Sequence, residues 1–88
     1  MRHEKVITPT VEAVKSCLAH VLPQLPEDPE ANLFEAGAID SLSLMEATSA
    51  IERTFAVTFE PDDLRADNFR SLQRITKTVE RLVAGRVP

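Results

Sequence analysis

Residues 33–42 read Leu-Phe-Glu-Ala-Gly-Ala-Ile-Asp-Ser-Leu, and within them a long loop gives way to an amphipathic helix. The helix is predicted from Ser41 to about Phe55, because successive helical residues are rotated by about 100° and the apolar residues of this stretch then share one face. The residues on that face are Leu44, Ala47, Thr48, Ile51 and Phe55. We expect this face to pack in the core.

The opposite face of this helix is not uniformly polar. Leu42 lies there together with Glu46, and Met45 lies on the flank. The pattern therefore predicts an exposed apolar residue directly after Ser41.

A first helix and a loop precede this segment. Thr8-Pro9 predicts the helix start, because threonine caps free amides and proline suits the first helical position. The helix is expected to run to about Leu22, and the three prolines at positions 23, 26 and 29 predict a loop up to Asp40. Four apolar residues should anchor this loop, namely Leu25, Leu33, Phe34 and Ile39. Alternatively, Leu42 folds back onto Leu33 or Phe34 and is covered by them.

Two further helical segments are predicted near the C-terminus. The stretch Pro61-Asp62-Asp63-Leu64 predicts a short turn whose two acids suit the positive end of a helix. Residues 67–70 should break it, and Ser71 should cap a last helix that ends near Gly85. The apolar stripe of that helix consists of Leu72, Ile75, Val79, Leu82 and Val83. The chain is therefore predicted to be all-α, a small bundle of three main helices and one short helix.

Length and composition limit the possible functions. A chain of 88 residues supports one modest core but no deep catalytic cleft, so we expect no catalysis by this chain alone. We expect a single domain over residues 1–88, with a core of about 8–84 and mobile tails. Cys17, the one cysteine, is expected to be a small buried residue. Because no signal peptide or membrane span is apparent, a reduced cytoplasmic protein is expected.

Charge is distributed unevenly along the chain. Residues 27–63 carry −9, with Arg53 as their one base, whereas the first 26 residues carry +1 and the last 25 carry +4. A chain with a net charge of −4 is repelled by phosphate backbones, so we expect partners that present Lys and Arg and no nucleic acid. The C-terminal bases are interpreted as a solvated face attracted to the acidic half, or alternatively as a docking surface. They are Arg65, Arg70, Arg74, Lys77 and Arg81.

The segment Gly37-Ala38-Ile39-Asp40-Ser41-Leu42 resembles the attachment motif of the carrier proteins of fatty acid, polyketide and nonribosomal peptide synthesis. Supporting matches are Leu33-Phe34, Ile51, Phe55, Asp63-Leu64 and Asn68-Phe69-Arg70-Ser71-Leu72. The resemblance covers roughly residues 8–84 and implies a four-helix fold. It also implies that a phosphopantetheinyl transferase attaches 4′-phosphopantetheine from coenzyme A to Ser41. The thiol of that arm would carry an acyl or aminoacyl group as a thioester.

The resemblance also implies roles for the neighbours of Ser41. Asp40 and Leu42 would complete the cofactor-binding motif, with Asp40 accepting a hydrogen bond from the helix start or coordinating the metal of the transferase. Partner enzymes are expected to contact Glu35, Leu42, Met45, Glu46 and Glu52. Besides the transferase, the expected partners are an acyl- or aminoacyl-loading ligase or transferase and condensing or tailoring enzymes, with the carrier itself monomeric.

Two residues depart from the most acidic fatty-acid carriers. Ser43 stands where an acidic residue is common, and Arg53 interrupts the acidic run. The chain is therefore not expected to interchange with generic fatty-acid synthase enzymes. The pattern Asp63-Leu64 and Asn68-Phe69 looks more like discrete carriers of secondary metabolism that act in trans. An unmodified helical interaction module with the same fold is the competing interpretation.

Ser41 also admits simpler interpretations. Serine at a helix start is most often an N-cap. A hydrolase would pair Ser41 with Asp40 and with His20 or His3, but a Gly-x-Ser-x-Gly turn is missing and Asp40 is badly placed to orient a base. Neither the histidines nor the acids of residues 27–30 have metal-site spacing, so no metal is expected.

Overall fold

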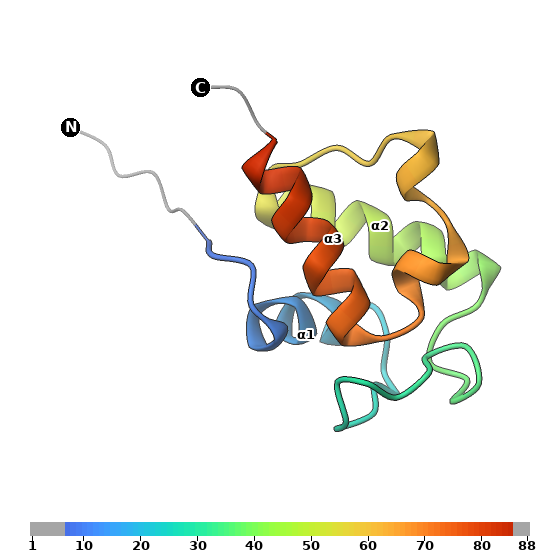
Figure 1. Cartoon of the computed structure of the whole chain (residues 1–88). Helices are drawn as coiled ribbons and strands as arrows, with labels where there is room; N and C mark the ends of the chain where they lie inside the picture. The colour runs from blue at the N-terminus through green and yellow to red at the C-terminus, as the bar shows by residue number, and fades with distance from the viewer. Residues whose placement is uncertain (1–6, 86–88) are drawn as a thin grey trace.

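This computed structural model describes residues 7–85 of the chain. They fold into three α-helices and two short 3-10 helices joined by loops (Figure 1). These helices are α1 Val11–Ala19, α2 Ser41–Phe55, η1 Pro61–Asp63, η2 Ala66–Phe69 and α3 Leu72–Ala84. Residues 7–85 contain no strand, so the all-α class is confirmed, and the 3-10 helices take the place of the predicted short helix. His3 and most of the expected mobile tails lie outside the described residues.

Side-chain caps set where α1 and α3 begin. The cap of α1 is Thr10 and not Thr8 as predicted, because the Oγ1 atom of Thr10 accepts the N–H of Ala13 over 3.1 Å. The cap of α3 is Ser71 as predicted, and its hydroxyl accepts the N–H of Arg74 over 3.1 Å. In both helices the hydroxyl satisfies an amide that the helix itself leaves without a partner.

The end of α1 also differs from the prediction, since the helix stops at Ala19 instead of about Leu22. The N–H groups of Val21 and Leu22 both donate to the carbonyl of Leu18, over 2.9 and 2.7 Å, so the chain tightens into a turn. The physical reason is Pro23, because proline disfavours helical backbone in the residue before it. The turn leaves Leu22 buried in the core.

The loop between α1 and α2 is held against the start of α3. The N–H of Leu33 donates to the carbonyl of Arg70 over 2.7 Å, and the N–H of Gln73 donates to the carbonyl of Pro29 over 2.9 Å. The four predicted anchors all pack on the core: Leu25, Leu33, Phe34 and Ile39. The chain therefore enters α2 from a position that side chains and backbone both define.

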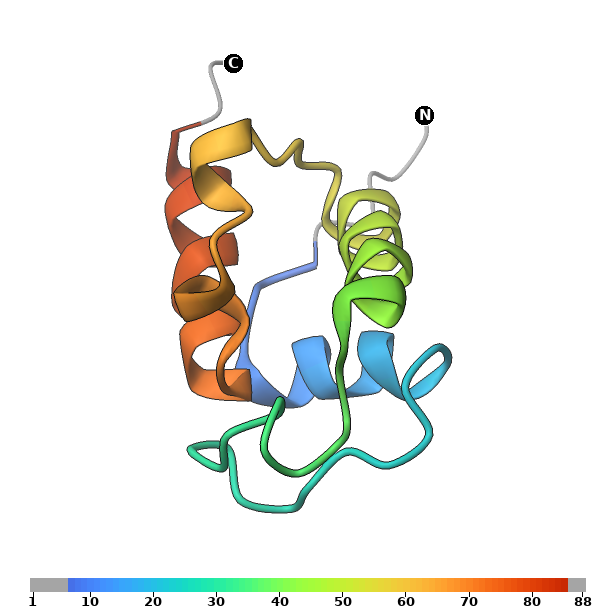
Figure 2. The same ribbon diagram turned by 90° about the vertical axis from the view of Figure 1, so that its right-hand side faces the viewer.

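The core is shared by all three α-helices. α1 packs against both α2 and α3, and the latter two stand on opposite sides of the bundle (Figure 2). The connection between them adds the buried side chains of Val57, Phe59 and Phe69, and the last two rings have their centroids 5.5 Å apart. The predicted apolar faces are confirmed, with Ala47, Ile51, Phe55, Leu72, Ile75 and Val79 buried and Leu44, Thr48, Leu82 and Val83 half-buried.

The connection between α2 and α3 is more ordered than predicted. The turn at Pro61 is present as η1, but residues 67–70, which were expected to break helical structure, fall largely within η2. The Nδ2 atom of Asn68 donates to the carbonyl of Asp63 over 2.9 Å, and Phe69 is fully buried. One hydrogen bond and one buried ring thus fold this segment onto η1 and the core.

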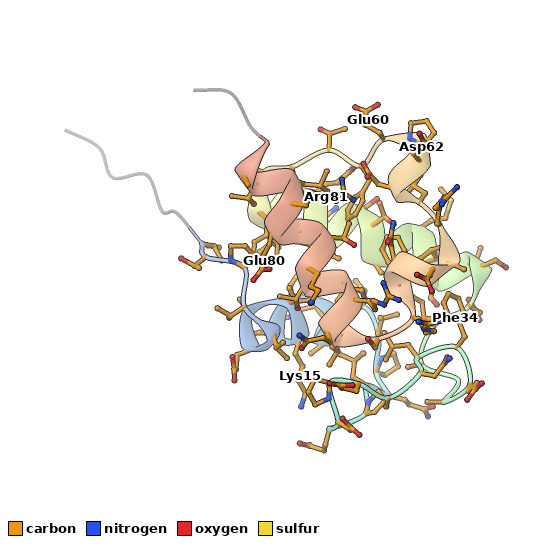
Figure 3. All side chains as sticks on the ribbon, in the orientation of Figure 1. Lys15, Phe34, Glu60, Asp62, Glu80 and Arg81 are labelled. Carbon is orange, nitrogen blue, oxygen red and sulfur yellow. The ribbon has the colours of Figure 1, made fainter. Side chains whose placement is uncertain are left out.

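Asp63 is a buried carboxylate that joins η1 to α3. Its Oδ2 atom accepts the N–H of Glu60 over 2.8 Å, and its Oδ1 atom accepts a hydrogen bond from Nη2 of Arg81 over 2.9 Å. Arg81 lies on the part of α3 next to η1, where Glu60 and Asp62 occupy the outer edge (Figure 3). The Glu60 N–H, and after it Arg81, lower the pKa of Asp63. The sequence pattern had indicated only that this acid suits the positive end of a short helix.

Candidate functional site

Asp40 caps α2, and Ser41 is the first residue inside the helix. One carboxylate oxygen of Asp40 accepts the N–H groups of Leu42 and Ser43 over 3.0 and 2.8 Å. The Ser43 hydroxyl in turn accepts the N–H of Asp40 over 2.9 Å, which completes a capping box. The interpretation of Ser41 as the N-cap is therefore wrong, and the hydrogen bond expected from the helix start to Asp40 is confirmed.

The hydroxyl of Ser41 is available to another molecule. The residue is exposed, and its side chain has no hydrogen-bond partner within residues 7–85. Since Asp40 performs the capping, the fold makes no structural use of the Ser41 oxygen. This is the property that a covalent attachment site requires.

Asp40 remains a carboxylate at neutral pH. The N–H of Ser43, then the hydroxyl of Ser43 and the N–H of Leu42, lower the pKa of Asp40 by donating hydrogen bonds to its charged form. A negative charge therefore lies beside Ser41 at the positive end of the helix.

Gly37 shapes the turn that leads into the site. Its φ of +76° lies in the left-handed region, and a Cβ added there would meet no atom within 4 Å, so backbone conformation and not space favours glycine. The N–H groups of Ala38 and Ile39 then donate to the carbonyl of Leu33 over 2.9 and 3.2 Å. The turn buries Ile39 and leaves the next two residues on the surface.

Leu42 and Met45 present an apolar surface beside Ser41. They are 80% and 69% exposed, which makes them the most exposed of the large apolar side chains in residues 7–85. The prediction for Leu42 is confirmed, and the alternative that it folds onto Leu33 or Phe34 is wrong. Two adjacent exposed apolar side chains on one helix face are typical of a contact surface for another protein.

The three acids expected to orient partners differ in their surroundings. Glu35 and Glu46 are exposed. Glu52 is half-buried, and its Oε2 atom accepts the N–H of Phe59 over 2.9 Å. Glu52 therefore stabilises the chain that follows α2, whereas the other two carboxylates are open to solvent.

A shallow groove continues the surface around Met45. It has a volume of about 530 Å³ and is lined by His20, Val21, Met45, Glu46, Ser49 and Arg53. The sequence pattern did not predict that His20 and Val21 belong to this surface. They follow α1 and reach α2 only because the two helices pack together, and no local sequence signal reports that contact.

The groups of the hydrolase alternative do not form a triad with Ser41, because none of them is hydrogen-bonded to its hydroxyl within residues 7–85. His20 lines the groove at Met45, and one carboxylate oxygen of Asp40 accepts the amides of Leu42 and Ser43. Cys17 is buried as predicted, with its Sγ atom 3.3 Å from Oγ1 of Thr54. The described residues contain no group of three or more His, Cys, Asp or Glu side chains arranged to hold a metal. None of the helices in residues 7–85 combines the length and the apolar character needed to cross a membrane.

Comparison with known families identifies the chain. Residues 12–79 match the family described as "phosphopantetheine attachment site", and this match spans most of the 88 residues. The chain therefore belongs to that family, whose domain is the site of covalent 4′-phosphopantetheine attachment. Comparison with curated proteins and with solved structures finds no match.

Proposed function

We propose that Ser41 is the residue on which this carrier protein bears its 4′-phosphopantetheine. The observation that supports the assignment is the exposed hydroxyl at the first residue of α2, which has no hydrogen-bond partner within residues 7–85. When attached, the group supplies a flexible arm whose terminal thiol holds an acyl or aminoacyl group as a thioester.

The residues around Ser41 fit a phosphate ester. A helix N-terminus favours an anion, because its free N–H groups and the helix dipole both point toward it. The amides of Leu42 and Ser43 already donate to Asp40, which leaves the N–H of Ser41 itself for a phosphate oxygen. The ester would share the helix start with the Asp40 carboxylate, and that carboxylate is a candidate ligand for the metal of the modifying transferase.

Incubation of the chain with coenzyme A and a broad-specificity phosphopantetheinyl transferase, followed by intact-mass measurement, tests this assignment. We expect one added phosphopantetheine group on the natural chain and none on Ser41→Ala. Ser49→Ala is the matched control, because Ser49 is an exposed serine in the same helix, and it should be modified normally. An adduct that persists in Ser41→Ala would refute the assignment. No adduct on the natural chain would favour the unmodified interaction module.

We also propose that partner enzymes dock on the surface formed by Leu42 and Met45, with Glu35 and Glu46 setting their orientation. Buried apolar anchors supply most of the affinity at such contacts, whereas rim charges mainly speed encounter. Glu52 contributes less than predicted from the sequence, because its carboxylate is bonded to the backbone of Phe59. Partners with Lys and Arg around an apolar depression would fit this surface.

The pathway is the finer part of the proposal. Ser43 replaces an acid on the docking face and completes the capping box, and Arg53 adds a positive charge farther along α2. Both reduce the negative charge that a fatty-acid synthase enzyme would meet. We therefore favour a carrier of polyketide or nonribosomal peptide type, loaded and used by separate cytoplasmic enzymes.

A loading assay measures this preference. The phosphopantetheine-bearing chain is offered to an aminoacyl-activating ligase and to a fatty-acid malonyl transferase at equal concentrations. Faster loading by the ligase supports the secondary-metabolism assignment, and faster loading by the malonyl transferase contradicts it.

A further inference from the structure

Three basic side chains lie on one face of α3, and a fourth lies just before the helix. Arg74, Lys77 and Arg81 are spaced i, i+3 and i+7, which places residues on one helix face. We name these four residues the basic stripe: Arg70, Arg74, Lys77 and Arg81. All four are exposed. The first of them directly precedes Ser71, the N-cap of the helix.

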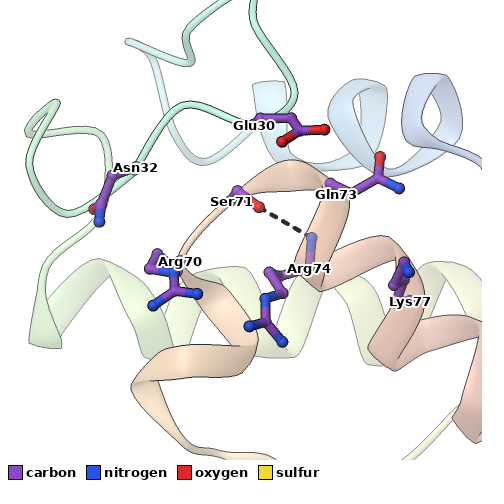
Figure 4. Close-up of a pocket in the computed structure, with 7 residues that line it drawn as sticks. All are labelled: Glu30, Asn32, Arg70, Ser71, Gln73, Arg74 and Lys77. Atoms are coloured by element: carbon purple, nitrogen blue, oxygen red, sulfur yellow. Dashed lines mark hydrogen bonds between the residues drawn. The ribbon is translucent and has the colours of Figure 1, made fainter.

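Two open depressions follow the basic stripe. The first, of about 450 Å³, is lined by three cations and one carboxylate, together with three uncharged polar residues (Figure 4): Arg70, Arg74, Lys77, Glu30, Asn32, Ser71 and Gln73. The second, of about 270 Å³, is lined by Arg74, Lys77 and Arg81. The two depressions share Arg74 and Lys77 as lining residues, so they lie next to each other along the helix.

The carboxylates beside the basic stripe position its arginines without covering them. Asp67 forms ion pairs with Arg70 and Arg74, with N···O distances of 2.9 and 3.3 Å, yet these two arginine side chains stay 47% and 44% exposed. Arg81 is 59% exposed although it binds Asp63. Each guanidinium has five N–H donors, so donors remain for another acceptor. Lys77 has no ion pair within the described residues.

We propose that the basic stripe is a docking surface for an acidic segment of a partner protein. The seven residues of helix from Arg74 to Arg81 span about 10 Å, which matches about three residues of extended chain, and Arg70 lies beyond the start of the helix. Cations spread over that length suit a row of carboxylates better than a single small anion. Charge complementarity would align the carboxylates of the acidic segment with the cations of the basic stripe and would speed the encounter of the two proteins.

Other polyanions fit this surface less well. A basic helix that binds membranes needs an exposed apolar face, but Leu72, Ile75 and Val79 of α3 are buried in the core. A nucleic acid would be repelled by the rest of a chain whose net charge is −4. α2 and α3 stand on opposite sides of the bundle (Figure 2).

The proposal extends the carrier function without depending on it. The apolar surface at Leu42 and Met45 lies on α2, whereas three cations of the basic stripe lie on α3, so two proteins could be held at the same time. Because modification of Ser41 is not required, the test uses the full chain carrying Ser41→Ala. Failure of one proposal therefore leaves the other unaffected.

Titration of the ¹⁵N-labelled chain with an octaglutamate peptide at low salt tests the inference. We expect chemical-shift changes concentrated at residues 70–81, and a dissociation constant that rises about tenfold in the double variant Arg74→Gln/Lys77→Gln and with added salt. Lys77→Glu alone should also weaken binding, and it breaks no ion pair within residues 7–85. Arg53→Gln removes a positive charge outside the basic stripe and should leave the dissociation constant within about twofold.

Three results would overturn the inference. Equal weakening by Arg53→Gln would show unspecific attraction. Equal affinity for inorganic phosphate would show a small-anion site. Tighter binding to an oligonucleotide or to phosphatidylserine vesicles than to octaglutamate would assign the basic stripe to a different polyanion.

Discussion

The two ends of α2 use their side chains in opposite ways. At the start, Ser41, Leu42 and Met45 point into solvent, and the hydrogen bonds there serve only to begin the helix. At the end, Phe55 is buried and Glu52 accepts the N–H of Phe59. The connection that follows continues this pattern up to the buried Asp63.

This difference separates binding from stability within one helix. A side chain with no partner in the fold can be offered to another protein at little structural cost, whereas a side chain bonded to the fold cannot. Substitutions at the end of α2 and in its connection should therefore change the free energy of unfolding. Substitutions at its start should change partner reactions instead.

The largest effect is expected from Phe55→Ala. The ring is 3% exposed, and removing a buried ring costs about 3–5 kcal/mol through lost burial and the cavity left behind. Urea unfolding followed by circular dichroism measures the change. A loss in the free energy of unfolding below about 1 kcal/mol would contradict the claim that the end of α2 serves stability.

Asp63→Asn should lower the free energy of unfolding by about 1.5 kcal/mol. The new amide can still accept the Glu60 N–H through its oxygen, but the charged hydrogen bond to Arg81 is lost. The value is at the low end for charged hydrogen bonds because Arg81 is exposed. Asp62→Asn is the control, since Asp62 is an exposed neighbour, and it should change stability by less than about 0.5 kcal/mol.

The same pair predicts a pH dependence. The folded pKa of Asp63 lies below its ordinary value of 3.8, so its contribution is complete above that value and is lost as pH falls through the lower folded pKa. Unfolding measured from pH 7 to pH 2 should show the natural chain and Asp63→Asn converging in stability below about pH 4. A constant difference down to pH 2 would mean that the charge of Asp63 contributes nothing.

Ala56→Gly should stabilise the chain by about 0.5–1 kcal/mol. Ala56 ends α2 with φ +57° and ψ +47°, a conformation that costs a residue with a Cβ about 1–2 kcal/mol. The greater freedom of glycine in the unfolded chain offsets part of the gain. Gly37→Ala is the reverse experiment and should destabilise by a similar amount, because the φ of Gly37 is +76°. Two changes of the same sign would contradict the explanation.

The smallest effect on stability is expected from Leu42→Ala, below about 0.5 kcal/mol, since the side chain is 80% exposed. Transfer of an acyl or aminoacyl group to or from partner enzymes should nevertheless slow. Thermal melting and a single-turnover loading assay on the same preparation measure the two quantities. A large loss of stability would show that Leu42 belongs to the core. Unchanged transfer would show that Leu42 does not contact the partner enzymes.

Much of this fold could be predicted locally. The apolar spacing placed α2 over Ser41–Phe55 and left Leu42 exposed, and both are confirmed. Ser71 as a cap and Gly85 as the end of the last helix were likewise apparent. These features depend on residues within one or two helical turns, and helical periodicity and capping act over that range.

The start of α1 was misplaced because two local alternatives have similar quality. Thr8 and Thr10 are both plausible caps, because either hydroxyl could accept the N–H of the residue three positions later. Ser41 and Asp40 also both suit an N-cap, and the structure assigns that role to Asp40, in line with the hydrogen bond expected from the helix start to its carboxylate. That assignment makes the Ser41 hydroxyl available, so a one-residue difference in the cap matters for the proposed function.

Contacts between distant residues lay beyond the sequence pattern. The pairing of Asp63 with Arg81, the bond from Phe59 to Glu52 and the approach of His20 to Met45 each join separate elements. Periodicity identifies which face of a helix is apolar, but it contains no information on which other face that surface meets. Packing against a common core brings these groups together. The pairing of Asp63 with Arg81 and the groove beside Met45 therefore depend on the tertiary structure, whereas the basic residues of α3 were already apparent from their spacing.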